Sequence, residues 1–148
     1  MSATKVVALE DPETFLSKVF EILDSYDFDR FPEVFATDLE YQGGLQKDEG
    51  LENFTQNLKK QMQIMPAMKT SHSRFKNDIT NNTIYSSGTS TAIFDALPDS
   101  PSVTIPMIGR FDVVTDGPEA GKISKMYIYK DRVPFLPFIQ KLPGMSKR

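Results

Sequence analysis

The hydrophobic residues between positions 15 and 26 recur at intervals of three and four, which is the spacing of an amphipathic helix. Asp11 precedes this run as a helix N-cap, and Pro12 stands at the first helical position, where its missing backbone N–H is not needed. We therefore predict a helix from Pro12 to about Ser25 that buries one wide stripe. The stripe consists of Phe15, Leu16, Val19, Phe20, Ile22, Leu23 and Tyr26.

The pattern changes twice before the middle of the chain. A short helix is expected around Pro32 to Ala36, followed by a brief strand from Leu39 to Gly43 that ends in a glycine pair. Apolar positions then return at helical spacing from Leu51 to Met65, and Pro66 ends that run because proline cannot continue a helix.

The second half of the chain is typical of strands. Four runs rich in β-branched and aromatic residues are separated by turn residues such as the pair Asn81 and Asn82, which tolerate the positive φ of a hairpin turn. Helices first and antiparallel strands afterwards predict an α+β domain whose helices cover one face of a curved sheet. The predicted strands are Thr70–Ile79, Thr83–Phe94, Ser102–Val114 and Lys122–Lys130.

Composition fits one domain spanning residues 1–148, with an apolar tail at 133–148. The chain has no cysteine, which excludes thiol catalysis and cysteine-based zinc sites. Its formal net charge of −3 gives no basic footprint for nucleic acid. The start lacks the apolar run of a secretory signal, and no stretch approaches the ~18 residues of a membrane span. We expect a soluble, cytoplasmic protein that binds neither nucleic acid nor membrane.

Motifs for common cofactors are absent from the sequence. The eight glycines form no phosphate-binding loop, and no spacing of histidine or carboxylate residues suggests a metal site. A serine nucleophile elbow is missing as well. We therefore expect no cofactor and no metal.

His72 is the only histidine of the chain and its first candidate for acid/base chemistry, because imidazole exchanges protons near neutrality. It begins a predicted strand and shares a face with Thr70 and Arg74. A structural histidine that is only hydrogen-bonded is the alternative. The five tyrosines, with Tyr26 and Tyr41 among them, fit core aromatics whose hydroxyl groups reach water.

The order of elements resembles the nuclear transport factor 2-like superfamily, particularly its SnoaL-like branch, along nearly the whole chain. The resemblance rests on the segments 27–31 (Asp-Phe-Asp-Arg-Phe) and 36–38 (Ala-Thr-Asp), and on the turn at 121–123 (Gly-Lys-Ile). It implies a cone-shaped, cystatin-like α+β fold whose curved sheet and helices enclose an apolar pocket. Such pockets serve polyketide cyclases, ketosteroid isomerases, scytalone dehydratases and limonene epoxide hydrolases, and also non-enzymes.

The enzyme branches differ in how well their residues match. The catalytic base of ketosteroid isomerases corresponds to a position near Gly43, where there is no carboxylate. The charged Asp-Arg-Asp set of epoxide hydrolases corresponds to positions near Ser90, Ala92 and Ile128, so these charged residues are missing. Scytalone dehydratase is more similar, since the segment 24–27 (Asp-Ser-Tyr-Asp) resembles its Tyr-Asp pair. The segment 70–72 (Thr-Ser-His) resembles the strand that carries one of its two catalytic histidines.

The resemblance implies a site with His72, Tyr41, Tyr26 and Asp27 as catalytic residues. It implies a cofactor-independent enzyme of specialised metabolism that isomerises, cyclises or dehydrates a hydrophobic polyketide-, terpenoid- or alkaloid-like intermediate. A non-catalytic binding or dimerisation domain of the same fold is the alternative. The residues expected to bind the substrate are Arg74, Ser90, Phe94, Met107, Phe111, Met126 and Ile128.

Two expectations concern surfaces. Tyr127 and Tyr129 share a strand face that is expected to form a homodimer through the outer side of the sheet. The apolar tail from Val133 to Met145 is broken by three prolines and is expected either to cover the pocket opening or to pack against the first helix or a partner subunit.

Overall fold

The structure is a computed structural model that describes residues 6–64 and 68–142. Its first half is helical, as predicted, and α2 (Pro12–Asp24) is the main helix. The side chain of Asp11 accepts a hydrogen bond of 3.2 Å from the backbone N–H of Thr14, which confirms the expected cap. The helix buries Leu16, Val19, Phe20 and Ile22, so the predicted stripe faces the core.

The remaining helices are short except one. The element α1 (Val7–Glu10) precedes α2, and the 3-10 helix η1 (Phe28–Arg30) leads into α3 (Phe31–Val34). The strand β1 (Phe35–Gly43) begins at once, so the prediction of helix up to Ala36 was wrong. Phe35 pairs with Ile123 of a neighbouring strand, and this long-range pairing overrides the local helical pattern. After β2 (Gln46–Glu49), α4 covers Leu51–Ile64.

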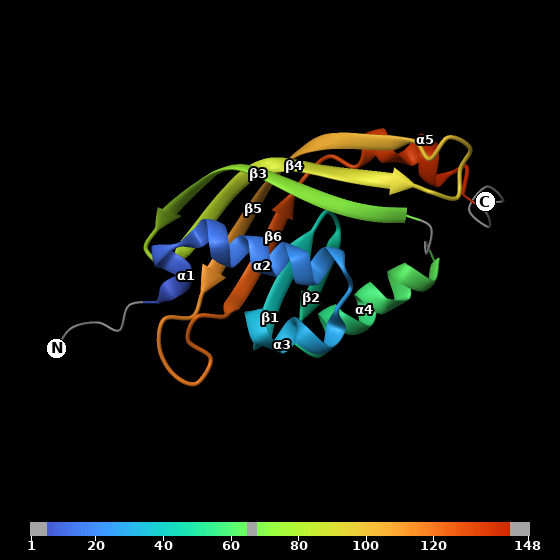
Figure 1. Cartoon of the computed structure of the whole chain (residues 1–148). Helices are drawn as coiled ribbons and strands as arrows, with labels where there is room; N and C mark the ends of the chain where they lie inside the picture. The colour runs from blue at the N-terminus through green and yellow to red at the C-terminus, as the bar shows by residue number, and fades with distance from the viewer. Residues whose placement is uncertain (1–5, 65–67, 143–148) are drawn as a thin grey trace.

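The second half forms most of a six-stranded sheet with the order β2-β1-β6-β5-β4-β3. The strands β3 (Met68–Thr80), β4 (Thr83–Phe94), β5 (Ser102–Val113) and β6 (Ile123–Tyr129) form the predicted antiparallel meander. One pair departs from that expectation, because β1 runs parallel to β6. The sheet curves over α2, which crosses its concave side (Figure 1). The α+β class is confirmed.

A bulge bends the edge of the sheet. Arg74 pairs with Gly88 and Lys76 with Ser87, so Phe75 is the extra residue of β3. A Cβ atom at Gly88 would overlap the backbone of Ser73 and lie 2.7 Å from the Cα of Arg74. Glycine therefore permits the close approach of the two strands at the bend.

Two apolar clusters fill the concave side of the sheet. The larger lies between α2, α3, α4 and the sheet, and it includes Phe20, Phe31 and Phe111. The smaller lies at the far ends of β4 and β5, where Phe94 packs against Phe135 of η2 (Val133–Phe135) and Phe138 of α5 (Leu136–Ile139). The C-terminal segment thus closes one end of the sheet (Figure 1).

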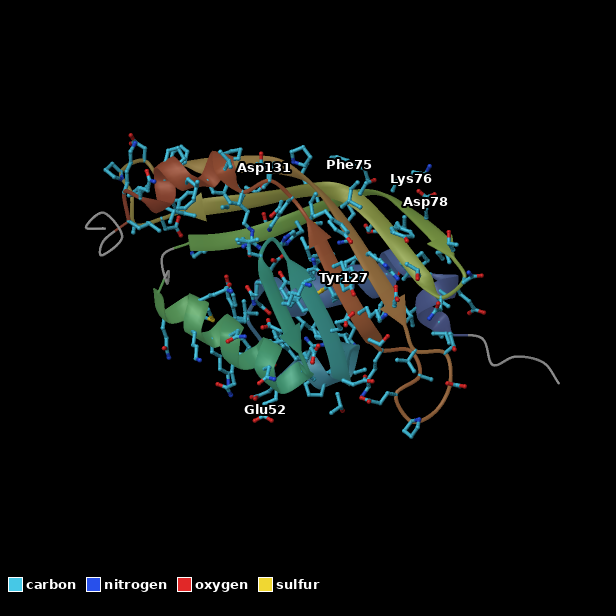
Figure 2. The ribbon with its side chains drawn as sticks, turned by 180° about the vertical axis from the view of Figure 1, so that it is seen from behind. Glu52, Phe75, Lys76, Asp78, Tyr127 and Asp131 are labelled. Atoms are coloured by element: carbon cyan, nitrogen blue, oxygen red, sulfur yellow. The ribbon has the colours of Figure 1, made fainter. Side chains whose placement is uncertain are left out.

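The convex side of the sheet carries polar and aromatic groups. Arg110 forms an ion pair of 3.1 Å with Asp112 and lies over the ring of Tyr127, which donates a hydrogen bond to Glu40. Figure 2 shows this side, with Tyr127 on β6. Tyr129 is 54% exposed. No helix within the described ranges is long and apolar enough to cross a membrane.

Candidate functional site

A cavity of about 190 Å³ lies between α2, α4, the central strands and the C-terminal segment. Most of its lining is apolar, and the polar groups gather on the side formed by α2, β3 and the end of β6. The cavity is lined by Phe20, Leu23, Asp24, Tyr26, Tyr41, Phe54, Leu58, Gln61, Thr70, His72, Met126, Ile128, Lys130, Arg132, Phe135 and Ile139. A small apolar cavity with a few converging polar groups is the usual form of a ligand site.

His72 and Asp24 form the central pair of this site. The imidazole Nδ1 lies 2.9 Å from Asp24 Oδ1 and 3.1 Å from Oδ2, and the His72 side chain is 11% exposed. A carboxylate only accepts hydrogen bonds, so Nδ1 carries the proton and Nε2 is the accepting nitrogen of the neutral ring. Thr70 donates a further hydrogen bond of 3.1 Å to Asp24 Oδ1. Aspartate therefore fixes both the tautomer and the orientation of the imidazole.

The other ring nitrogen of His72 lies 3.3 Å from Ser90 Oγ. These two residues are direct partners across β3 and β4, and Ser90 is fully buried. Lys130 donates a hydrogen bond of 3.0 Å to the same Oγ atom. Because Ser90 accepts from lysine, its own proton is free to point at Nε2. The four side chains form a continuous chain from a carboxylate to an ammonium group.

Burial acts strongly on two groups of the cavity. It lowers the pKa of Lys130 from 10.5 to about 8, and the nearby positive charge of Arg132 adds to this effect, while Asp24 opposes it. Burial also raises the pKa of the Tyr41 hydroxyl, against a hydrogen bond and the charge of Arg132. Tyr41 therefore stays protonated and can donate a hydrogen bond to a ligand.

Phe20 and Arg74 hold His72 in place from the side of α2. The Phe20 ring centroid lies 4.7 Å from the imidazole centroid, and the guanidinium carbon of Arg74 lies 5.4 Å from the Phe20 centroid. Arg74 also donates to Glu13 Oε1 and Ser17 Oγ on α2, both at 2.5 Å. It braces β3 against the helix and does not line the cavity.

The structure brings together several of the residues predicted from the sequence. His72, Tyr41 and Tyr26 line the cavity with Met126 and Ile128. Tyr26 adopts φ +55 directly after α2, which turns the chain at the cavity rim.

The other predicted residues lie outside the lining. Asp27 precedes η1 and makes no side-chain capping bond there. Ser90 lies behind His72, and Phe94 belongs to the smaller apolar cluster. Met107 and Phe111 are buried in the larger cluster, where Phe111 meets Phe20 edge to face.

The C-terminal tail shares in the cavity wall. Phe135 and Ile139 line it while they also pack with Phe94 at the end of the sheet. In the described part of the tail, which ends at Leu142, the side chains of Phe135, Phe138 and Leu142 pack in the smaller apolar cluster, and Phe135 and Ile139 line the cavity. Residues 143–145 of the predicted segment lie outside the described residues.

Three polar residues of the site were missed as functional residues by sequence reasoning. Asp24 is the partner of His72 but stands 48 positions earlier in the chain. Lys130 and Arg132 directly follow the last strand, and isolated basic residues at the end of an apolar strand were the available signal. Their burial and convergence were not visible in the pattern.

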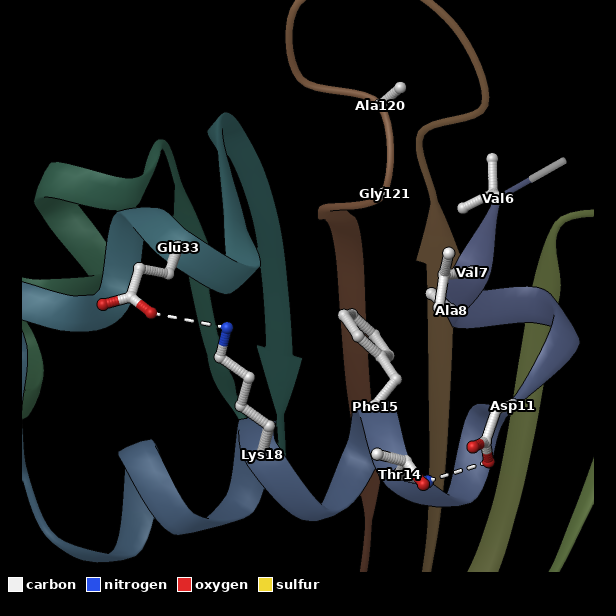
Figure 3. Close-up of a pocket in the computed structure, with 10 residues that line it drawn as sticks. All are labelled: Val6, Val7, Ala8, Asp11, Thr14, Phe15, Lys18, Glu33, Ala120 and Gly121. Atoms are coloured by element: carbon white, nitrogen blue, oxygen red, sulfur yellow. Dashed lines mark hydrogen bonds and ion pairs between the residues drawn. The ribbon is translucent and has the colours of Figure 1, made fainter. Parts of the chain in front are cut away.

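A larger hollow of about 550 Å³ lies beside α1, the start of α2 and the loop before β6 (Figure 3). Its charged groups are already occupied, since Asp11 caps α2 and Lys18 pairs with Glu33 at 3.4 Å. The side chains of that pair are about half exposed, so they remain in water. The hollow offers no acid/base pair, and the smaller cavity is the better candidate site. No cluster of three potential metal ligands occurs among the described residues.

Comparison with known proteins gives one close relative. The chain is 49% identical over 147 residues to the sordarin/hypoxysordarin biosynthesis cluster protein G of Sordaria araneosa, covering 99% of this chain and 98% of the relative. No protein-family model matches the sequence.

Solved structures with the same architecture are more distant in sequence. TerC, co-crystallised with polyporic acid, matches with a TM-score of 0.68 at 12% identity, over 86% of this chain and 97% of TerC. A SnoaL-like protein of Jannaschia sp. CCS1 matches with a TM-score of 0.62 at 13% identity, over 97% and 99% of the two chains. At these identities the two structures bear on the fold alone.

Proposed function

Because this chain belongs to the same family as the Sordaria araneosa protein and has the fold of a SnoaL-like structure, we propose that it is an enzyme of specialised metabolism. It acts on a hydrophobic small molecule without a cofactor. The reaction is an isomerisation, a cyclisation or a dehydration driven by proton transfer. The relative's place in a biosynthesis cluster supports the metabolic setting.

The observation that carries the proposal is the Asp24–His72 pair at the wall of an apolar cavity. With the proton on Nδ1, Nε2 is the basic nitrogen of the ring, and it lies 3.3 Å from the buried Ser90 Oγ. Proton transfer from a substrate to Nε2 therefore requires the side chain of His72 or Ser90 to shift, so that the substrate replaces this long contact. The carboxylate of Asp24 then stabilises the imidazolium that forms. His72 returns the proton to another atom of the same substrate, so the protein ends the cycle unchanged.

The surroundings suit this chemistry. An apolar cavity excludes water and strengthens each electrostatic contact inside it. Tyr41 is buried and protonated, so its hydroxyl can donate to a carbonyl oxygen while charge builds up on that atom. Proton removal beside a carbonyl, with such a donor, is the shared first step of enolisation, ring closure and loss of water.

A test in the cell compares the organism that encodes this protein with a strain in which the chromosomal gene for the protein carries the change His72→Ala. We expect the variant strain to accumulate an intermediate that the purified wild-type protein consumes. An intermediate of the same mass as the product indicates isomerisation or cyclisation, and one heavier by a molecule of water indicates dehydration. An unchanged metabolite profile with a folded variant contradicts an essential role of His72.

A chemical test needs no knowledge of the substrate. 5-Nitrobenzisoxazole is a small apolar molecule that opens when a base removes its one acidic carbon-bound hydrogen. We expect the wild-type protein to accelerate this opening, and His72→Ala to lose about a hundredfold or more of that acceleration. Lys130→Met is the matched control, because it keeps His72 and removes the other basic side chain of the hydrogen-bonded series Asp24, His72, Ser90 and Lys130. If His72→Ala and the wild type open the probe equally fast, His72 is not the base, and the protein fits a non-catalytic binding domain better.

A further inference from the structure

The charges at the cavity wall do not balance. Asp24 supplies the negative charge of the lining, and it is bound by His72 and Thr70. Lys130 and Arg132 supply two positive charges at the end of β6. Among the residues that the structure describes, neither of these cations forms an ion pair with a carboxylate.

The partners of the two cations are neutral oxygen atoms. Lys130 donates to Ser90 Oγ at 3.0 Å, and Arg132 lies near the hydroxyl of Tyr41, whose pKa the arginine lowers against the effect of burial. Neutral partners satisfy hydrogen bonds but leave the charge uncompensated, which is unfavourable for a lysine placed against an apolar wall. Arg132 is exposed at the rim, whereas Lys130 lies deeper.

We propose that Lys130 and Arg132 form an anion-binding subsite at one end of the apolar cavity, so that the substrate is an amphiphilic carboxylic acid. This inference rests on the proposed function and narrows its substrate class. The apolar body of the acid lies among Phe54, Met126, Ile128 and Phe135, and the carboxylate lies between the two cations. A charged anchor at one end orients the rest of the molecule toward His72.

The groups that face Lys130 support this placement. They are Asp24 from α2, His72 through Ser90, and Arg132 with its partner Tyr41. The carboxylate of Asp24 is bound to His72, and the others are neutral or positive. An incoming carboxylate therefore meets the two positive charges of Lys130 and Arg132 against the single negative charge of Asp24, so the lining is net positive.

The experiment measures binding by titration calorimetry with two probes of the same shape. 1-Adamantanecarboxylate carries the charge, and 1-adamantanecarboxamide replaces it with a neutral amide on the same compact hydrocarbon cage. We expect the wild-type protein to bind the carboxylate about tenfold more tightly than the carboxamide at pH 7. At a pH of about 8.5, carboxylate binding should also take up protons, because the anion favours the charged form of Lys130.

Variants assign the preference to the two cations. Lys130→Met and Arg132→Leu should each reduce the preference for the carboxylate, and the double variant should bind both probes equally. Lys125→Met is the control, since Lys125 lies exposed on β6, the strand that precedes the two cations, and outside the cavity. Thermal melting checks that each variant is folded.

The outcomes separate this inference from the proposed function. Equal binding of the two probes by the wild type, absence of carboxylate binding, or a preference that survives in the double variant overturns the anion subsite. His72→Ala should keep the full preference even though it loses the opening of 5-nitrobenzisoxazole. A failed proton-transfer test with an intact carboxylate preference therefore counts against the proposed catalysis and for the subsite.

Discussion

The buried charge of Lys130 should lower the free energy of unfolding at neutral pH by a measurable amount. A lysine whose pKa falls from 10.5 to about 8 on folding holds its proton less tightly in the folded state than in the unfolded one. At about 1.4 kcal/mol per pH unit, this difference amounts to roughly 3 kcal/mol, and we reduce it to about 2 kcal/mol because part of the side chain reaches solvent. The protonated lysine therefore destabilises the folded protein at neutral pH.

The prediction concerns Lys130→Met, which keeps the length of the side chain and removes its charge. The variant also loses the hydrogen bond to Ser90, which is worth about 1 kcal/mol. We expect the variant to be more stable than the wild type by about 1 kcal/mol at pH 7. A substitution that removes a buried polar contact is thus expected to stabilise the protein.

The free energy of unfolding should change with pH in a direction that tests this reasoning. Between about pH 8 and pH 10.5 the unfolded chain keeps the proton of Lys130 and the folded protein has released it. The unfolded state then binds more protons, so the free energy of unfolding of the wild type rises with pH in this window. The variant lacks this proton, and its advantage should shrink by about 2 kcal/mol and reverse near pH 10.

Urea unfolding at pH 7 and near pH 10 measures these differences. Lys125→Met is the control, because this exposed lysine should change stability by less than about 0.5 kcal/mol at either pH. A Lys130→Met variant that is less stable than the wild type at pH 7, or whose difference from the wild type is the same at both pH values, refutes the reasoning. The lysine would then not be desolvated in the folded protein.

Three further predictions follow from other parts of the structure. In Asp24→Asn the new amide can both donate and accept a hydrogen bond, so the proton of His72, the single histidine, should no longer be confined to Nδ1. Long-range ¹H–¹⁵N NMR reports which ring nitrogen carries the proton, and an unchanged tautomer contradicts the prediction. Gly88→Ala should lower the free energy of unfolding by about 3 kcal/mol, because the new Cβ overlaps the backbone of Ser73; a loss below about 1 kcal/mol in urea unfolding would show that the strands separate easily. The convex face should mediate a homodimer, so Tyr129→Glu should yield monomers in sedimentation experiments in which the wild type is dimeric; a monomeric wild type at micromolar concentration rules this out.

Much of the fold could be read from local patterns. The cap at Asp11 and the helical spacing that follows predicted α2, and the β-branched and aromatic run from Ser102 predicted β5, in which the buried Ile105, Met107 and Phe111 alternate with more exposed residues. These features depend on neighbours within a few residues, so the sequence contains them directly. The error at Ala36 arose where a distant strand decided the conformation.

Only part of the candidate site could be predicted from the sequence. The sequence determined that a single imidazole exists, and its resemblance to a known family placed His72, Tyr26 and Tyr41 at an apolar pocket. Only the tertiary structure decided that Asp24 orients His72, because the register of β3 against β4 and the packing of α2 join residues 48 positions apart.

The positive charge at the cavity wall also depends on the tertiary structure. Lys130 and Arg132 read as ordinary surface residues in the sequence, since a polar residue after a strand normally points into water. The curvature of the sheet and the C-terminal segment that closes its end bring both to the cavity wall. A pKa depends on the dielectric surroundings and the charges within a few ångströms, and these exist only once distant parts of the chain have come together.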